Sequence, residues 1–214
     1  MKLYGYWRSS AAYRVRIALQ LKGIDCQQVT VNLLKGEQGA AAYLAVNPAG
    51  LIPALELDDG RYLSQSTAII QWLDSEHPQP PLLPDDAFDR AQVLSCVYTV
   101  ACEIHPLNNI GILNYLKSEL GADKAQTLAW MTAWFKRGFA SLEASISAAP
   151  YCFGDRVTMA DIFLVPMAYN ALRFDYDLGS LHPKVMAVYE ACNTLPAFGD
   201  ARPENQPDAV PPSY

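Results

Sequence analysis

The stretch KLYGYWRSSAAYRVRIALQLK, residues 2–22, decides how the N-terminal part of the chain folds. Residues 2–7 form a short apolar segment that is typical of a strand, and Ser9 or Ser10 is suited to cap a following helix. We predict that this helix runs to about Lys22, because Gly23 follows it and glycine commonly ends helices. The order strand, two serines and helix therefore places hydroxyl groups at a helix N-terminus.

The next segments predict a small mixed sheet. Residues 28–33 alternate apolar and polar side chains, as a half-buried strand does. Residues 52–57 and 61–63 are predicted strands, joined at Asp59-Gly60, which is a type I′ turn signal. Ser66 is expected to cap the next helix. The order β-α-β followed by β-β-α predicts a four-stranded sheet with one parallel crossover and one antiparallel hairpin.

The predicted secondary structure changes from mixed strands and helices to helices alone after a proline-rich stretch. Residues 77–84 contain four prolines, so they predict a linker. Beyond it, helical patterns fill about 88–118 and 123–148, and strand alternation is lacking. We therefore expect an α/β domain over 1–80 and an all-helical domain over 86–214. Clefts between domains commonly bind ligands.

The start of one helix in the second domain is indicated by two capping patterns. Thr158 and Asp161 have the spacing of a capping box, and Val157 with Ile162 fits a hydrophobic staple. A helix is predicted from there to about Arg173, and another helix follows a proline at position 183.

Composition excludes several classes of function. The 214 residues carry a formal net charge of −6, which disfavours nucleic acid or an anionic membrane as a partner. No apolar run approaches the roughly 20 residues that span a bilayer. The five cysteines are scattered and lack zinc spacing, so we expect free thiols, no metal and a cytoplasmic location.

Three short segments are candidates for binding chemistry, each with a plainer structural interpretation. Ser9 and Ser10 could lower the pKa of a thiol at the helix start, or could simply cap the helix. Ile52-Pro53, if cis, would aim the Ile52 N–H and C=O at a bound peptide; otherwise it is an ordinary turn. Ser66, after Gln65, could bind a carboxylate or act as a cap.

Together, these segments occur in an order that resembles the glutathione transferase superfamily. Residues 8–19, RSSAAYRVRIAL, resemble the zeta-class signature S-S-C-x-x-R-V-R-I-A-L. Asn47-Pro48, Ile52-Pro53, Gln65-Ser66 and the segments 161–166 and 173–178 extend the resemblance over essentially the whole chain. The signature cysteine is Ala11 here, so the resemblance implies that the reacting sulfur comes from bound glutathione.

The resemblance implies a thioredoxin-like N-terminal domain, an all-helical C-terminal domain and a homodimer. It also implies that glutathione acts as a cofactor in the cis–trans isomerisation of a small dianionic maleyl substrate. Zeta-class enzymes isomerise maleylacetoacetate in tyrosine and phenylalanine breakdown, and close relatives that share the pattern isomerise maleylpyruvate. A general glutathione transferase or peroxidase, and a non-catalytic binding module, remain alternatives.

The resemblance also implies roles for individual residues. Ser10, helped by Ser9, would hold the glutathione thiolate, while Arg8 and Arg173 would neutralise the substrate carboxylates and the developing negative charge. The residues expected to bind glutathione are Ser9, Ser10, Ala11, Arg14, Gln38, Ile52, Pro53, Gln65, Ser66, His105, Asn108 and Asn109. Arg14 and Arg16 cannot both face the same way on the helix, so at least one should be structural or solvent-facing.

Overall fold

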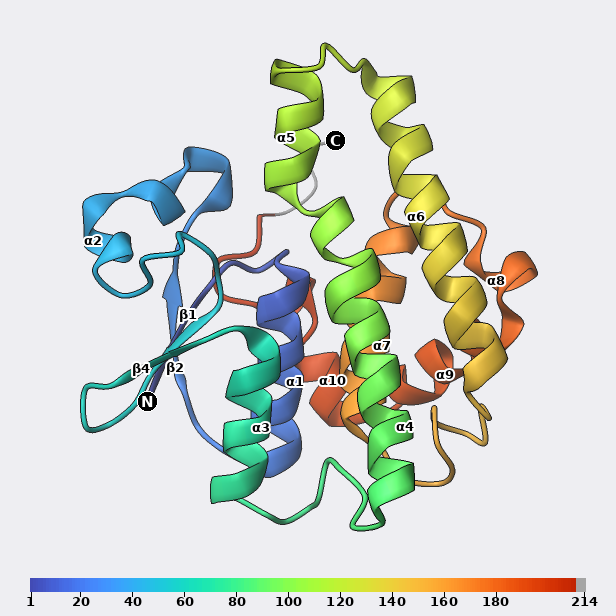
Figure 1. The fold of residues 1–214 in the computed structure, drawn as a ribbon. Helices are drawn as coiled ribbons and strands as arrows, with labels where there is room; N and C mark the ends of the chain where they lie inside the picture. The colour runs from blue at the N-terminus through green and yellow to red at the C-terminus, as the bar shows by residue number, and fades with distance from the viewer. Residues whose placement is uncertain (211–214) are drawn as a thin grey trace. The chain divides into compact units, whose positions relative to one another are not determined.

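The computed structural model describes residues 1–210, which form two compact units (Figure 1). The first unit contains Met1–Pro81 and the segment that begins at Asn193, and the second contains Leu82–Cys192. The first is α/β and the second is all-helical, so the predicted fold class is confirmed. Residues 211–214, the end of the predicted second domain, lie outside the described part of the chain.

The sheet of the first unit has four strands. These are β1 (Lys2–Gly5), β2 (Gln27–Thr30), β3 (Ala54–Glu56) and β4 (Tyr62–Ser64), in the spatial order β2-β1-β3-β4. β1 pairs in parallel with β2 and antiparallel with β3, and β3 pairs antiparallel with β4, so the predicted mixed sheet is confirmed. Leu3 and Leu55 are paired and fully buried, which marks the face that the long helices cover.

Helices α1 (Ser10–Lys22) and α3 (Ser66–Glu76) pack on each other along one side of the sheet (Figure 1). The Lys22 ammonium at the end of α1 donates to Asp74 and to the carbonyls of His77 and Pro80, each at 2.6 Å. This buried cation fixes the end of α3 and the start of the proline-rich stretch to α1. The unit also contains α2 (Ala41–Leu44), α10 (Pro196–Asp200) and 3₁₀ turns at Leu33–Lys35, Glu37–Gly39 and Pro203–Asn205.

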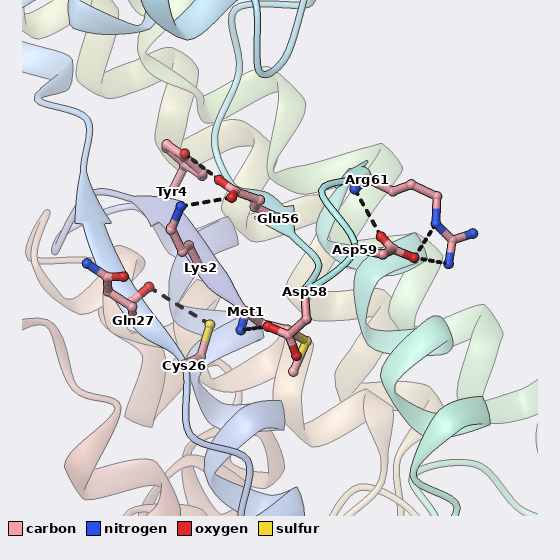
Figure 2. Close-up of polar contacts among 9 residues, drawn as sticks. All are labelled: Met1, Lys2, Tyr4, Cys26, Gln27, Glu56, Asp58, Asp59 and Arg61. Carbon is pink, nitrogen blue, oxygen red and sulfur yellow. Dashed lines mark hydrogen bonds and ion pairs between the residues drawn. The ribbon is translucent and has the colours of Figure 1, made fainter.

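The other face of the sheet carries a small hydrophobic cluster. Tyr43 of α2 packs with Ala54 and Tyr4 there. Figure 2 shows that Glu56 accepts hydrogen bonds from the Tyr4 hydroxyl at 2.7 Å and from the Lys2 ammonium at 2.8 Å. The Glu56 carboxylate raises the pKa of Tyr4 to about 12, so this phenol remains a donor at neutral pH.

The β3–β4 connection confirms the predicted hairpin but not its turn type. A type I′ turn needs positive φ at both central residues. Gly60 has φ +83°, whereas Asp59 is not among the residues of positive φ in the described chain. The Gly60 N–H instead donates to the Leu57 carbonyl at 3.0 Å, and Asp59 accepts from Arg61 (Figure 2). The turn is therefore longer than the two-residue loop that the dipeptide indicated.

The second unit is built from helices alone. They are α4 (Ala87–Tyr98), a π-helical turn (Thr99–Ile104), a 3₁₀ turn (Pro106–Asn108), α5 (Ile110–Ser118), α6 (Lys124–Ser145), α7 (Met159–Leu172), α8 (Leu178–Leu181) and α9 (Pro183–Asn193). The helix predicted over 88–118 is thus interrupted. Pro106 has no N–H to continue the helix, and the Asn109 side chain caps a new helix by accepting from the Ile112 N–H at 3.0 Å.

The predicted capping box is confirmed at the start of α7. The Thr158 hydroxyl accepts from the Ala160 N–H, and the Asp161 carboxylate accepts from the Thr158 N–H at 2.7 Å. Twelve of the fourteen residues of α7 are buried, so this helix forms the centre of the second unit. No helix within residues 1–210 is both long and apolar enough to cross a membrane.

The C-terminal segment lies in the first unit. Residues 193–210 pack on α1 through α10, where Tyr13 and Arg16 of α1 hydrogen-bond to the carbonyls of Phe198 and Ala201. The sequence prediction had placed this segment in the second range, 86–214, because nothing in its sequence signals a contact with α1. That residues 1–80 and 86–214 form two separate domains stays a prediction.

Candidate functional site

The N-terminus of α1 is the first part of the candidate site. Ser9 is the N-cap, and its Oγ accepts from the Ala12 N–H at 3.2 Å. Because that oxygen already accepts, the Ser9 O–H proton is available for donation to a ligand. The N–H groups of Ser10 and Ala11 have no acceptor within residues 1–210, as expected for the first turn of a helix. This end of α1 is therefore suited to bind an anion.

Arg8 lies directly before the cap. It is half-buried, and its guanidinium carbon lies 4.8 Å from the centre of the Trp7 ring. Such stacking orients a guanidinium while leaving its N–H donors in the plane free to contact a ligand. The Trp7 indole N–H is buried and has no hydrogen-bond partner within the described residues. Sequence reasoning did not identify Trp7, because an isolated tryptophan gives no signal of an unpaired donor.

Arg14 and Ser66 form the second part of the site. The Arg14 Nη1 donates to the Ser66 Oγ at 3.3 Å, and both residues are buried. Burial lowers the pKa of the Arg14 guanidinium to about 9, so it remains a cation at neutral pH. Ser66 is the first residue of α3, whose N-terminus adds a partial positive charge. A carboxylate would be stabilised there by the cation, the hydroxyl and the helix together.

Gln65 has a strained backbone next to this pair. Its φ is +69° and ψ +115°, a region that residues with a side chain seldom occupy. Its side chain is exposed and makes no capping hydrogen bond to α3. Strain of this kind costs about 1–3 kcal/mol and often occurs at ligand sites. The conformation thus supports Gln65 as a binding residue rather than a helix cap.

The strain at Gln65 predicts that two variants that both lack its side chain differ in stability. Gln65→Gly is expected to be more stable than Gln65→Ala by about 1 kcal/mol, because glycine adopts positive φ without a Cβ clash. Both variants should bind glutathione more weakly than the native protein. Urea unfolding and calorimetric titration with glutathione measure the two effects. Equal stability of the two variants would contradict the strain.

Two further glutathione candidates lie in the loops of the first unit. The Ile52–Pro53 bond is cis, and neither the N–H nor the C=O of Ile52 has a partner among residues 1–210. Gln38 lies in a 3₁₀ turn, and its Oε1 is buried without a hydrogen-bond partner in the described part of the chain. Unpaired polar groups of this kind are costly unless a ligand satisfies them. Both segments therefore fit a bound peptide.

The remaining candidates belong to the second unit. His105 ends the π-helical turn and is half-buried. Asn108 is 5% exposed, and both polar atoms of its side chain lack a partner among the residues that the structure describes. Asn109 uses its side-chain oxygen to cap α5, which leaves its amide N–H₂ for a ligand. The three residues lie within one short stretch, where the chain passes from the π-helical turn through the 3₁₀ turn to α5. π-Turns are frequent at functional sites.

Arg173 lies at the C-terminal end of α7. It is exposed, it donates to the Asn170 Oδ1 at 3.2 Å, and its guanidinium carbon lies 5.1 Å from the Phe174 ring centre. The structure therefore brings together Arg14 and Ser66, and separately His105, Asn108 and Asn109. Among residues 1–210, no group of three or more His, Cys, Asp or Glu side chains is arranged to hold a metal ion.

The chain matches the glutathione S-transferase N-terminal domain over residues 3–81 and the C-terminal domain over residues 125–191. It is 46% identical to maleylacetoacetate isomerase of Pseudomonas aeruginosa, over 97% of this chain and 98% of that protein. The holo structure of a bacterial maleylpyruvate isomerase, a zeta-class glutathione S-transferase, has a TM-score of 0.94 at 44% identity, covering 98% of this chain and 100% of the other.

A third relative was solved with ligands. Maleylacetoacetate isomerase of Methylobacterium extorquens AM1, with bound malonate and glutathione, has a TM-score of 0.94 at 36% identity, covering 98% of this chain and 100% of the other. The similarity extends over both units, as the sequence resemblance implied. The chain belongs to the glutathione S-transferase family, and within that family to the zeta class.

Proposed function

We propose that the protein is a glutathione-dependent cis–trans isomerase of small maleyl diacids, with maleylacetoacetate as the first candidate substrate. The observation that carries the proposal is the N-terminus of α1, where the Ser9 hydroxyl and two free N–H groups can stabilise a thiolate. Ala11 occupies the position of the signature cysteine, so the chain has no thiol of its own there. The relatives that it matches over nearly their full length are named isomerases of this class.

The residues of the first unit fit glutathione. Arg14, Ser66 and the N-terminus of α3 would hold the γ-glutamyl carboxylate, with Gln65 beside them. The free backbone groups of Ile52 would pair with the cysteinyl residue, and the Gln38 Oε1 would accept from the N–H of the glycyl residue. When bound, glutathione supplies a thiolate that adds reversibly to the substrate double bond and so allows rotation about it.

The protein's own contribution is to keep that thiol ionised and to neutralise the substrate. Ser9 and the N-terminus of α1 lower the thiol pKa by favouring its charged form. Ser10 follows the cap as the first residue of the helix, and its N–H points toward the same end. Arg8 and Arg173 pair with carboxylates and with the negative charge that develops during the reaction. In the second unit, His105, Asn108 and Asn109 provide further donors.

The role of Arg173 predicts a selective loss of substrate binding. Arg173→Ala is expected to raise the KM for the maleyl diacid by about tenfold or more, because a charge-assisted pair is worth about 1.5–3 kcal/mol. Glutathione affinity should not change. Arg137→Ala is the matched control, since Arg137 is also exposed and stacks on a ring, that of Trp134. An unchanged KM in Arg173→Ala would contradict the assigned role.

The substrate itself is decided by kinetics. Purified protein with glutathione is given maleylacetoacetate and, separately, maleylpyruvate, and kcat/KM is measured for each. We expect maleylacetoacetate to be preferred; a preference for maleylpyruvate would assign the alternative substrate. Glutathione conjugation to electrophiles or reduction of hydroperoxides, without isomerisation of either diacid, would indicate a general transferase or peroxidase instead.

We propose further that the protein works as a cytoplasmic homodimer. All five cysteines are free, and three of them are buried, which fits a reducing compartment. Each unit exposes large apolar side chains, such as Leu51 (54% exposed) in the first and Phe88 (71% exposed) in the second. Exposed apolar surface of this kind supports association. Sedimentation equilibrium at micromolar concentration is expected to give twice the monomer mass, and a monomer mass would contradict the dimer.

A further inference from the structure

The segment from Asn193 to Val210, here named the C-terminal clasp, is held together by its own hydrogen bonds. The Arg202 guanidinium donates to the Asn193 Oδ1 at 3.0 and 3.1 Å. The Gln206 amide donates to the carbonyls of Asp200 and Arg202 at 2.9 and 2.8 Å. The clasp is thus a defined piece of structure and not a loose tail.

The clasp contacts α1 at two side chains. Arg16, which is 4% exposed, donates through Nε to the Ala201 carbonyl at 3.0 Å. Tyr13, also buried, donates its hydroxyl proton to the Phe198 carbonyl at 3.3 Å. As the spacing indicated, Arg16 faces away from the Arg14–Ser66 pair, and it has a structural role.

Two charged side chains, Arg16 of α1 and Asp208 of the clasp, also hydrogen-bond to the loop that precedes α1. The Arg16 Nη2 donates to the Trp7 carbonyl at 3.0 Å, and the Asp208 Oδ2 accepts from the Trp7 N–H at 3.0 Å. Both backbone groups of Trp7 are therefore bonded to charged side chains, and one of those side chains belongs to the clasp. The next two residues are Arg8 and Ser9. The Ser9 N–H donates back to the Tyr6 carbonyl at 2.9 Å, which closes the turn.

We propose that the C-terminal clasp is a positioning element for this loop: Asp208 and Arg16 fix Trp7, and Trp7 sets where Arg8 and the Ser9 hydroxyl lie. Its effect on catalysis rests on the function proposed above. A hydrogen bond to a charged group is strong and directional, so one such bond on each of the two peptide groups that flank Trp7 restricts the movement of the loop. Charge stabilisation at a reacting atom depends on donors held in place beforehand. The clasp supplies that restraint from about 200 residues away in the chain.

The test compares three variants by hydrogen exchange. Asp208→Ala removes the acceptor, Asp208→Asn keeps an oxygen that can accept, and Asp200→Ala removes an exposed carboxylate of the same clasp. Exchange is followed in residues 7–12, with α3 as an internal reference. In Asp208→Ala we expect the bonded N–H groups of this segment, those of Trp7, Ser9 and Ala12, to exchange about tenfold faster, with α3 unchanged. Asp208→Asn should lie near the native protein, and Asp200→Ala should be indistinguishable from it.

The thiol pKa of bound glutathione and the kinetic constants test whether the clasp affects catalysis. In Asp208→Ala, the pKa of bound glutathione, followed by thiolate absorbance, is expected to rise by about half to one unit. The kcat should fall several-fold, and the KM for the diacid should rise, because the clasp also sets where Arg8 lies. Unchanged exchange in residues 7–12, or the same change in Asp200→Ala, would overturn the proposal. So would faster exchange with an unaltered thiol pKa, since the clasp would then be structural only.

The two proposals fail in different ways. If the native protein neither binds glutathione nor isomerises a maleyl diacid, the proposed function is wrong, and exchange in residues 7–12 still decides whether Asp208 holds the loop. If the native protein is active and Asp208→Ala behaves as the native protein does, only the role of the clasp is wrong.

Discussion

Replacing Ser9 by glycine is expected to lower the glutathione-dependent isomerisation rate at pH 7 by about 10- to 100-fold, because the thiol pKa rises by about one to two units when its hydroxyl donor is lost. Glycine is the informative substitution at an N-cap. It costs the helix only a few tenths of a kcal/mol, whereas alanine costs about 1 kcal/mol. The loss of rate in Ser9→Gly would therefore come from chemistry and not from fraying of α1.

The pH dependence of the rate shows whether the loss in Ser9→Gly comes from a raised thiol pKa. A donor that favours the thiolate lowers the thiol pKa, so activity is gained as the pH rises through the lowered value. Without the Ser9 hydroxyl, the same rise in activity should occur at higher pH, and the rate should approach the native value above it. A rate that is reduced equally at every pH would indicate lost binding geometry instead of a lost thiolate.

Ser9→Asp and Ser10→Ala complete the series. Aspartate is as good an N-cap as serine, but its carboxylate repels a thiolate, so Ser9→Asp should be stable and almost inactive. Ser10 is the first helical residue and its hydroxyl has no capping bond within the described residues, so Ser10→Ala should lose less activity than Ser9→Gly. A larger loss in Ser10→Ala would make Ser10 the main donor, as the resemblance alone implied.

Replacing Asp161 by alanine is expected to reduce the free energy of unfolding by about 3–5 kcal/mol, the largest effect on stability that we predict. Asp161 is fully buried. Its Oδ1 accepts from the Cys152 N–H at 2.7 Å, and its Oδ2 accepts from the Thr158 N–H at 2.7 Å and the Thr158 hydroxyl at 3.0 Å. Alanine would leave both buried N–H groups without an acceptor, at about 1–3 kcal/mol each.

Urea unfolding of three variants measures this effect. Asp161→Asn should also destabilise, because its amide nitrogen would face the donors of Thr158 or Cys152. Asp155→Ala, which removes an exposed carboxylate six residues earlier, should change stability by less than about 0.5 kcal/mol. A loss in Asp161→Ala no greater than that of Asp155→Ala would contradict the role of the buried carboxylate in starting α7.

Local sequence signals predicted the parts of the fold that depend on neighbouring residues. The capping box at Thr158 needs only two side chains three residues apart, and the hairpin needs a turn between two apolar runs. The turn type was wrong because Asp59-Gly60 alone does not fix the loop length. The break in the predicted helix 88–118 was missed because its cause combines Pro106 with a competing cap at Asn109, and apolar spacing continues through both.

Contacts between distant parts of the chain could not be predicted in this way. Ser9, Gln65 and Ser66 are candidates from the sequence because each is expected at the start of a helix, and their roles in binding stay a prediction. Arg14 was included through the family resemblance, and only the structure places it against Ser66. Asp208 and Trp7 lie about 200 residues apart, so no periodicity links them, and their contact required the fold.

If the thiol of bound glutathione is required for isomerisation, the native protein should respond differently to three conditions. Maleylacetoacetate isomerisation is measured with glutathione, with S-methylglutathione and with neither. S-Methylglutathione retains the carboxylates and peptide groups that the first unit would bind but has no ionisable thiol. We predict isomerisation only when glutathione is present, and competitive inhibition when S-methylglutathione is added to glutathione. Isomerisation at the same rate without a free thiol would contradict it.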